Sequence, residues 1–348
     1  MRMVVFSERL RAPYDEGIKS FAAHLAGVLA VEHDVLTLTT DGANDSAAGI
    51  VDMPANRLLL SIPLRRAIYA FQPQAIVYVP TACGTVFSFV RASLLRLYGR
   101  GACTALITLQ PRPHSATGRA MIRLLAPDWV MAQSQRTARA FAQMGCRSAL
   151  LPPAVNGQHF RPASREDRSA LRDKHGIPQP ATVVTHIGHL KGKRSLSQFL
   201  ALQGLDGYHT VLVASTSTQK DATLKQELQD AGTTVIDTYV EHVEEIYQLS
   251  DVYLFLAEDD TAAIELPLSV LEAMACNLPI VCTPFGGLRD FFEEGRGLVY
   301  YHGQSAVSDS IEVALSGPCT TRSLVEPHTW SALARTLVRH LQESTVKR

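Results

Sequence analysis

Two carboxylates and a pair of glycines stand near one another in the last third of the chain. Glu265 and Glu272 are seven residues apart, which is about two helical turns, so one side of a helix could present both. The loop with Gly286, Gly287 and Leu288 follows a short apolar run. Such a loop offers free backbone N–H groups to an anion. Carboxylate acceptors beside N–H donors suit a phosphorylated sugar, although a capped surface helix with solvated acids would leave the same pattern.

A helix and a strand are needed to hold these groups in place. Pro267 can begin the helix, because the first helical position needs no backbone donor. Asn277 can end it in the left-handed conformation, and Pro279 prevents its continuation. Ile280–Cys282 then reads as a short buried strand that leads into the glycine loop. The pattern therefore predicts helix, strand and loop in that order.

Three basic residues form a second candidate cluster. His189, Lys191 and Lys193 follow an apolar run at Thr182–Ile187. They would stand at the carboxyl end of a strand, where open α/β sheets bind their ligands. The alternative is a solvated basic face.

The run from Leu268 to Val281, followed by Pro284-Phe285-Gly286-Gly287-Leu288, resembles the donor-binding signature of glycosyltransferase family 4. Members of that family are retaining enzymes with the GT-B fold. The resemblance covers nearly the whole chain, most strongly residues 255–290 and only weakly the part before Gln110. It implies an α/β chain with two doubly wound, Rossmann-like domains facing across a cleft. It also implies a nucleotide-diphosphate sugar as the donor.

The resemblance assigns roles to the two carboxylates. Glu272 matches the family glutamate that binds the donor ribose. Ile264 stands where the family has its first glutamate. Glu265 is displaced from that position by one residue, and we take it as the candidate to replace the missing sugar-binding and catalytic carboxylate.

The resemblance also assigns groups to the donor phosphates. One of Lys191 and Lys193 would hold the diphosphate, with His189 in place of the family arginine. The backbone N–H groups of Gly286, Gly287 and Leu288 would stabilise the leaving diphosphate. Gly17 would lie near the donor phosphate and sugar, at a turn where family members usually carry two glycines. Family enzymes of this fold generally need no bound metal, so neither a metal nor another cofactor is expected.

One histidine is a candidate catalytic residue in the first half of the chain. The family often has a histidine at the position of Gln110, at the end of the predicted strand Thr104–Leu109. His114 follows four residues later and could take over that role. A lone histidine in a loop is otherwise simply solvated.

Apolar runs alternate with helical patterns along the chain, which is the βαβ rhythm of a doubly wound parallel sheet. We expect an N-terminal acceptor-side domain at 1–163, a nucleotide-sugar domain at 164–325, and a C-terminal helix at 326–348 that crosses back to the first domain. The remaining predicted strands are Met3–Phe6, Asp34–Thr40, Ala75–Val79, Trp129–Ala132, Ala149–Leu151, Thr210–Ala214, Thr233–Ile236, Val252–Leu256 and Gly297–Tyr300.

Length and composition fit an ordinary globular chain. The 348 residues suffice for two domains, and 46% are apolar and 19% charged. The six cysteines include no Cys-x-x-Cys pair, so they indicate neither a zinc site nor a disulfide framework. No basic-then-apolar leader precedes Val4, which favours a cytoplasmic protein. Residues 67–90 carry no charge, but their prolines, glutamines and glycine favour a buried strand, a turn and a helix over a membrane span.

The positive charge of this neutral chain is concentrated in the first half. Twelve arginines, no lysine and a single acid, Asp128, lie between Met53 and Leu150. We name Arg96, Arg112 and Arg123 as candidate residues of the acceptor side. In this part of the chain, arginines and apolar residues are mixed at helical spacing. Such mixing suits peripheral contact with an anionic membrane, and the acceptor would then be lipid-linked. A soluble anionic acceptor and mere solvation are the alternatives, and no nucleic-acid partner is expected.

These observations favour a hexosyl-type transfer with retention at the anomeric carbon. One alternative keeps the fold but changes the chemistry, as in a sugar-nucleotide epimerase or a phosphorylase. The other is a non-catalytic sugar-nucleotide-binding protein. The donor sugar, the base and the acceptor cannot be predicted from the residues.

Overall fold

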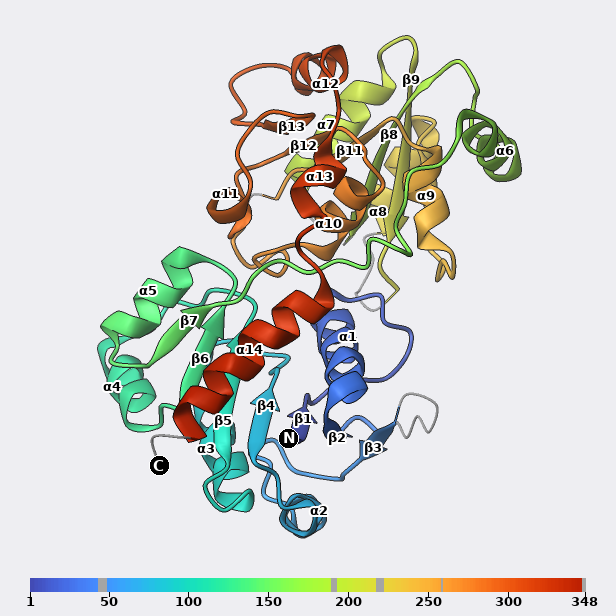
Figure 1. The fold of residues 1–348 in the computed structure, drawn as a ribbon. Helices are drawn as coiled ribbons and strands as arrows, with labels where there is room; N and C mark the ends of the chain where they lie inside the picture. The colour runs from blue at the N-terminus through green and yellow to red at the C-terminus, as the bar shows by residue number, and fades with distance from the viewer. Residues whose placement is uncertain (43–48, 189–192, 217–221, 258, 346–348) are drawn as a thin grey trace. The chain divides into compact units, whose positions relative to one another are not determined.

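A computed structural model describes residues 1–42, 49–188, 193–216, 222–257 and 259–345. The chain divides into two compact units (Figure 1), each of which is described by itself. The first comprises Met1–Pro152, Ala263–Leu266 and Trp330–Arg348, and the second Pro153–Ala262 and Pro267–Thr329. The first stretch ends at Pro152, whereas the sequence placed this boundary at residue 163. The last stretch begins at Trp330 rather than at residue 326.

The described residues of the first unit form a seven-stranded parallel sheet in the order β3-β2-β1-β4-β5-β6-β7. The order reverses direction between β1 and β4, as in a doubly wound sheet. The strands are β1 (Arg2–Phe6), β2 (Asp34–Thr39), β3 (Ile50–Asp52), β4 (Ala75–Tyr78), β5 (Cys103–Thr108), β6 (Trp129–Ala132) and β7 (Ser148–Leu150).

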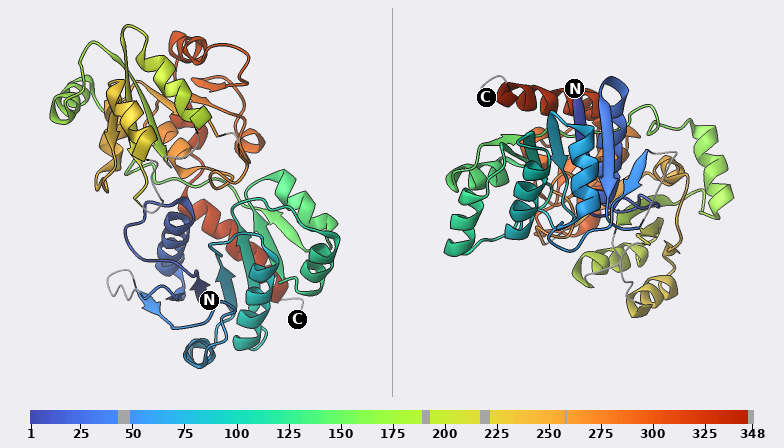
Figure 2. Two further views of the ribbon diagram at one scale, coloured as in Figure 1. Left: turned by 180° about the vertical axis from the view of Figure 1, so that it is seen from behind. Right: turned by 90° about the horizontal axis from the view of Figure 1, so that it is seen from below.

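Helices cover both faces of this sheet (Figures 1 and 2). Side chains alternate along a strand, and Val4 and Phe6 of β1 share one buried cluster with residues of the helices between β3 and β7. The first and last helices of the chain pack together on the other face. The helices of this unit are α1 (Gly17–Glu32), α2 (Ile62–Phe71), α3 (Val86–Tyr98), α4 (Ala116–Leu124), α5 (Gln135–Gln143) and α14 (Trp330–Thr345).

The C-terminal helix α14 is fastened to the first unit by specific contacts. Trp129 Nε1 donates to His340 O at 2.7 Å and to Ser344 Oγ at 2.9 Å. The Arg147 guanidinium lies 3.7 Å from the centroid of the Trp129 ring. At the other end of the helix, Trp330 stacks on His24 of α1 with ring centroids 5.0 Å apart. These contacts explain why the end of the chain folds with its beginning.

The second unit contains, within its described residues, a six-stranded parallel sheet in the order β10-β9-β8-β11-β12-β13. Its strands are β8 (Thr182–Gly188), β9 (Tyr208–Ala214), β10 (Thr234–Ile236), β11 (Val252–Phe255), β12 (Ile280–Cys282) and β13 (Leu298–Tyr300). Its helices are α6 (Arg165–His175), α7 (Lys193–Gln203), α8 (Ala222–Asp230), α9 (Val243–Leu249), α10 (Leu268–Ala275), α11 (Leu288–Phe291), α12 (Val307–Ser316) and α13 (Thr321–Val325).

The predicted parallel α/β architecture is confirmed, and every predicted strand is present within two residues at each end. The three-residue edge strand β3 was not predicted. The predicted start and end of α10 are also close to those observed. Pro267 is the N-cap residue of the helix, whereas the sequence predicted it as the first helical residue, and Asn277 has a left-handed φ of 58°. The uncharged stretch at 67–90 is divided between α2, β4 and α3. None of the helices in the described ranges combines the length and the apolar character needed to cross a bilayer.

Candidate active site

Glu272 lies in the middle of α10, and a buried tyrosine holds its carboxylate. Tyr247 Oη of α9 donates to Glu272 Oε2 at 2.8 Å. Burial raises the pKa of Glu272 to about 7, although the hydrogen bond from Tyr247 opposes this shift. Burial, followed by the charge of Glu272, raises the pKa of Tyr247 well above its ordinary value. The carboxyl group is thus poised to change charge near neutral pH, and Tyr247 is a partner that the sequence did not indicate.

The glycine loop connects β12 to α11. Gly286 has a φ of 55°, in the left-handed region that glycine adopts without strain. Leu288 N donates to Phe285 O at 3.1 Å, so a turn already uses one of the three N–H groups assigned to the phosphate. The role of the Leu288 N–H toward a phosphate stays a prediction. The N–H groups of Gly286 and Gly287 make no hydrogen bond within the described ranges, which leaves them available to an anion.

The basic cluster lies between β8 and the first turn of α7 in the chain. His189 and Lys191 lie outside the described residues. Lys193 is the first residue of α7, and its side chain also lies outside the described part. The cluster does follow β8, which ends at Gly188, so the predicted strand end is correct while the role of each basic residue stays a prediction.

Gly17 begins α1, and the structure places it beside the residue that replaces the family glutamate. A Cβ atom at Gly17 would lie 3.5 Å from three side-chain atoms of Ile264. Ile264 is buried. The surroundings of Gly17 are therefore apolar on this side, and no carboxylate stands at position 264 to receive a sugar hydroxyl.

Glu265 does not share a helix with Glu272, which corrects the initial interpretation of their spacing. It lies before α10 and belongs to the first unit. Its side chain is fully buried, and its Oε1 accepts from Ser134 Oγ and from Thr137 Oγ1, both at 2.6 Å. Two protein hydroxyls therefore engage one oxygen of this carboxylate, while its sugar-binding and catalytic role stays a prediction.

His114 is half-buried and its ring lies near Phe141. Its ring centroid is 6.0 Å from that of Phe141, and its Nε2 atom is buried without a hydrogen-bond partner among the described residues. Burial, and then the charge of Arg119, lowers its pKa. Gln110, at the position of the family histidine, instead donates to Ala263 O at 3.2 Å. The catalytic role of His114 stays a prediction.

The three arginines named for the acceptor side have different surroundings. Arg96 forms an ion pair with Asp128 at 3.6 Å, and Arg112 donates to Gln110 Oε1 at 3.4 Å. Arg123 is exposed on α4, where its aliphatic stem lies against Gly145. Arg123 is therefore the best placed of the three to meet an external anion.

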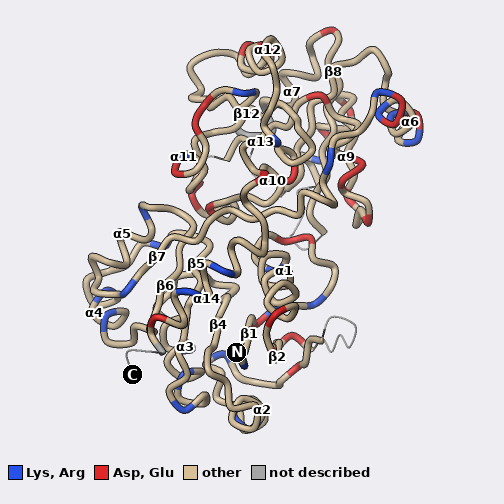
Figure 3. Tube along the Cα trace, in the orientation of Figure 1, with Lys and Arg blue, Asp and Glu red and all other residues tan. Residues whose placement is uncertain are grey.

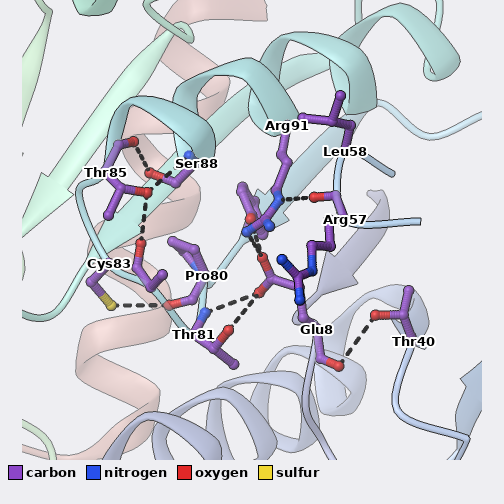
Figure 4. A network of polar contacts seen from close by, with 12 residues as sticks. Glu8, Thr40, Arg57, Leu58, Pro80, Thr81, Cys83, Thr85, Ser88 and Arg91 are labelled. Carbon is purple, nitrogen blue, oxygen red and sulfur yellow. Dashed lines mark hydrogen bonds and ion pairs between the residues drawn. The ribbon is translucent and has the colours of Figure 1, made fainter. Parts of the chain in front are cut away.

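A network at the carboxyl ends of β1 and β4 was not predicted (Figure 4). Glu8 accepts from Arg91 Nη1 at 2.7 Å, from Thr81 N at 2.9 Å and from the hydroxyl of Tyr78. Arg91 Nε in turn donates to Arg57 O at 2.7 Å. Burial and the charge of Glu8 raise the pKa of Tyr78 well above its ordinary value. This network joins the segments that follow β1 and β4 at the carboxyl ends of the first sheet.

Among the described residues, no three His, Cys, Asp or Glu side chains are grouped so that they could hold a metal ion.

Comparisons with known proteins agree with this architecture. Residues 183–343 match the family model for glycosyl transferases group 1. The D-inositol 3-phosphate glycosyltransferase of Geodermatophilus obscurus is 27% identical over 176 residues, which cover 45% of this chain and 37% of that protein. The sulfoquinovosyl transferase of Arabidopsis thaliana is 23% identical over 243 residues, covering 68% of this chain and 41% of that protein. The matches thus span less than half the length of either relative.

The fold comparison extends over both units. The structure of HepE from Anabaena in complex with UDP-glucose matches with a TM-score of 0.74 at 16% identity, covering 99% of this chain and 100% of that one. The chain therefore has the GT-B fold, with two Rossmann-like α/β domains and a glycosyl transferases group 1 match in the second half.

Proposed function

We propose that this protein is a retaining glycosyltransferase that moves a sugar from a nucleotide-diphosphate donor to an acceptor. The proposal depends mainly on one observation, the arrangement of groups around β12. Glu272 lies on α10, the helix that precedes β12 in the chain. In the loop that follows β12, the N–H groups of Gly286 and Gly287 are available to an anion. The family match over residues 183–343 and the UDP-glucose bound to HepE support a nucleotide sugar as the donor.

In the proposed reaction, the bond between the anomeric carbon and the diphosphate oxygen breaks, and its electron pair stays on the diphosphate. The acceptor hydroxyl oxygen forms the new bond on the same face of the sugar, and its proton passes to the leaving oxygen. The N–H groups of Gly286 and Gly287, with Lys191 or Lys193, stabilise the developing charge. Glu272 accepts hydrogen bonds from the ribose hydroxyls and so fixes the nucleoside.

The direct test supplies purified protein with UDP-, GDP- and ADP-sugars and measures release of the nucleoside diphosphate, with and without a lipid extract as acceptor. Transfer with an unchanged anomeric configuration, read by NMR of the product, supports the proposal. Isomerised nucleotide sugar would indicate an epimerase, and sugar 1-phosphate formed with added phosphate would indicate a phosphorylase. Tight nucleotide binding without turnover of any donor would leave a binding protein.

The raised pKa of Glu272 predicts a pH-dependent stability of the ligand-free protein. The folded state binds this proton more tightly than the unfolded state, so the stabilisation is fully present below the ordinary glutamate pKa and is lost as pH rises through about 7. Between pH 5 and 8, Tm of the wild type should therefore fall more steeply than Tm of Glu272→Gln. Glu293→Gln, at an exposed glutamate, is the control and should keep the wild-type slope. Parallel slopes for all three proteins would contradict the shifted pKa.

For the acceptor side we propose contact with an anionic membrane through the outer surface of α2, α3 and α4, named here the basic face. α3 packs against both α2 and α4, so the three helices form one layer. Figure 3 marks their arginines in blue. Leu97 is 70% exposed and Leu124 is 84% exposed, and Arg65 and Arg66 of α2 and Arg123 of α4 are exposed as well. Large apolar residues among arginines favour a lipid surface over a soluble anion, because both kinds of side chain gain from an interfacial position.

Binding to acidic vesicles should therefore depend on salt and on the basic face. Each arginine near the surface contributes about 1 kcal/mol, which salt screens. We expect co-flotation with phosphatidylglycerol vesicles at low ionic strength, release at high ionic strength, and weaker binding of the Arg66→Glu/Arg123→Glu variant. Arg335→Glu/Arg339→Glu is the matched control, because both residues are exposed on α14, which covers the other face of the same sheet. Absence of wild-type binding at low salt would favour a soluble anionic acceptor.

A further inference from the structure

Four residues from the second half of the chain fold as part of the first unit. The inserted segment, Ala263–Leu266, is flanked on both sides by residues of the second unit. Its backbone is held at the carboxyl ends of β5 and β6: Glu265 N donates to Leu109 O at 2.7 Å, and Leu266 N donates to Gln133 Oε1 at 3.4 Å. With the bond from Gln110 to Ala263 O, the whole segment is fastened at this edge.

The side chain of Glu265 adds two further hydrogen bonds to these attachments. Its two hydroxyl donors open α5, where Ser134 is the N-cap and accepts from Thr137 N at 3.1 Å. A carboxylate at this position interacts favourably with the positive end of the helix dipole. Hydrogen bonds to a charged acceptor are also stronger than neutral ones. Glu265 therefore joins the inserted segment to the first turn of α5.

The inserted segment ends immediately before the donor-binding helix. Leu266 is followed by Pro267, the cap of α10, and α10 carries Glu272. We propose that Glu265 is a positioning residue: it fastens the inserted segment, and with it the residue that precedes Pro267 in the chain, within the first unit, and it does not contact the sugar. The attachment of Glu265 to Ser134 and Thr137 is argued from the hydrogen bonds alone. The expected effect on kcat, in contrast, rests on the proposed function.

The test compares Glu265→Ala, Glu265→Gln, Thr137→Val and the Glu265→Ala/Thr137→Val double variant. Thr137→Val removes one hydroxyl donor while keeping the shape of the side chain. Thr117→Val, at an exposed threonine in the first turn of α4, is the matched control. Amide hydrogen exchange at Glu265 and Leu266 should accelerate about tenfold or more in Glu265→Ala, because a fastened segment exchanges only after local opening. Thr137→Val should accelerate exchange at the same two amides by a smaller factor, and Thr117→Val should leave their exchange unchanged.

Catalysis supplies the second readout. In Glu265→Ala, kcat should fall about tenfold, while Kd for the nucleoside diphosphate alone stays within about twofold, because α10 itself remains intact. Glu265→Gln should recover part of kcat, and Thr137→Val should add little to Glu265→Ala, since both remove one attachment.

Three outcomes would overturn the proposal. The first is a large loss of kcat in Glu265→Ala with unchanged amide exchange, while Thr137→Val keeps the wild-type kcat and exchange; this would indicate direct contact with the sugar. The second is that the effects of the two substitutions add up, and the third is that the whole protein is destabilised without faster local exchange. If no donor is turned over at all, the attachment is still tested by the amide exchange rates of the single variants and by whether the exchange effects of Glu265→Ala and Thr137→Val add up in the double variant. Failure of the proposed function is thus distinguishable from failure of this inference.

Discussion

Replacement of Glu272 with alanine should lower kcat/KM for the donor by about 5- to 150-fold, mainly through a higher KM. This range corresponds to the loss of hydrogen bonds worth about 1–3 kcal/mol. The carboxylate is held by Tyr247 Oη at 2.8 Å, so in the proposed function it is already oriented when a donor ribose binds. An oriented acceptor loses little conformational freedom on binding, which is why we expect a large effect from one side chain. Steady-state kinetics over a range of donor concentrations measures it.

The substitution also removes the acceptor of a buried tyrosine hydroxyl, so stability must be followed separately. Glu272→Gln retains an oxygen that can accept from Tyr247 and should lose less stability than Glu272→Ala. Glu293→Ala, at an exposed position in the same unit, should leave both KM and Tm unchanged. A wild-type KM combined with a lowered Tm in Glu272→Ala would show that Glu272 only stabilises α10.

Above pH 7 this effect should be largest, because the pKa of Glu272 is raised to about 7. A protonated carboxyl group accepts weaker hydrogen bonds from ribose hydroxyls than a carboxylate does. Donor KM of the wild type should therefore decrease as pH rises through this value, and that of Glu272→Gln should stay level.

The strands could be predicted from the sequence because parallel strands buried on both faces are continuous apolar runs. Val252–Phe255 and Ile280–Cys282 are of this kind and were found correctly. β3 was missed because three residues at a sheet edge carry no periodic signal. The end of α10 was predictable for a local reason, since Asn277 tolerates a positive φ and Pro279 cannot continue a helix.

The candidate site was less predictable, because its contacts join residues far apart in the chain. The spacing of Glu265 and Glu272 suggested a shared helix face, but α10 begins only at Leu268. The hydroxyls that bind Glu265 belong to residues more than a hundred positions earlier. No periodicity or motif connects such partners, and the same reason applies to Tyr247 beside Glu272.

For His114, the sequence suggested a role, but it could not predict the surroundings of the side chain. A histidine in a loop after a strand end has the type and position of an acid–base catalyst. Its packing against Phe141 is set by tertiary structure, and burial lowers its pKa. Residue type and spacing identified the candidates, and the fold shows what each described candidate contacts.

Replacement of Glu8 with alanine should lower the free energy of unfolding of the first unit by about 3 kcal/mol. The side chains of Glu8 and Arg91 are only 13% and 15% exposed. Removal of the carboxylate leaves Arg91 and the Tyr78 hydroxyl without their acceptor in a poorly hydrated place, and an uncompensated buried charge is costly. Arg91→Ala should be similarly destabilising, and the double variant should lose much less than the sum, because the remaining charge is then gone.

The chain offers both a selective probe and a matched control for this prediction. Its two tryptophans, Trp129 and Trp330, both lie in the first unit and are buried, so tryptophan fluorescence during urea unfolding follows that unit alone. The pair of Arg96 and Asp128 belongs to the same unit, but it is longer, at 3.6 Å, and Arg96 is 41% exposed. Ion pairs of this exposed kind contribute about 0–1 kcal/mol, so the coupling energy in a double-mutant cycle should be clearly larger for Glu8 and Arg91. Equal coupling for the two pairs would mean that water replaces the Glu8 network easily, and the loops at this edge would then have to be ordered by their apolar contacts instead.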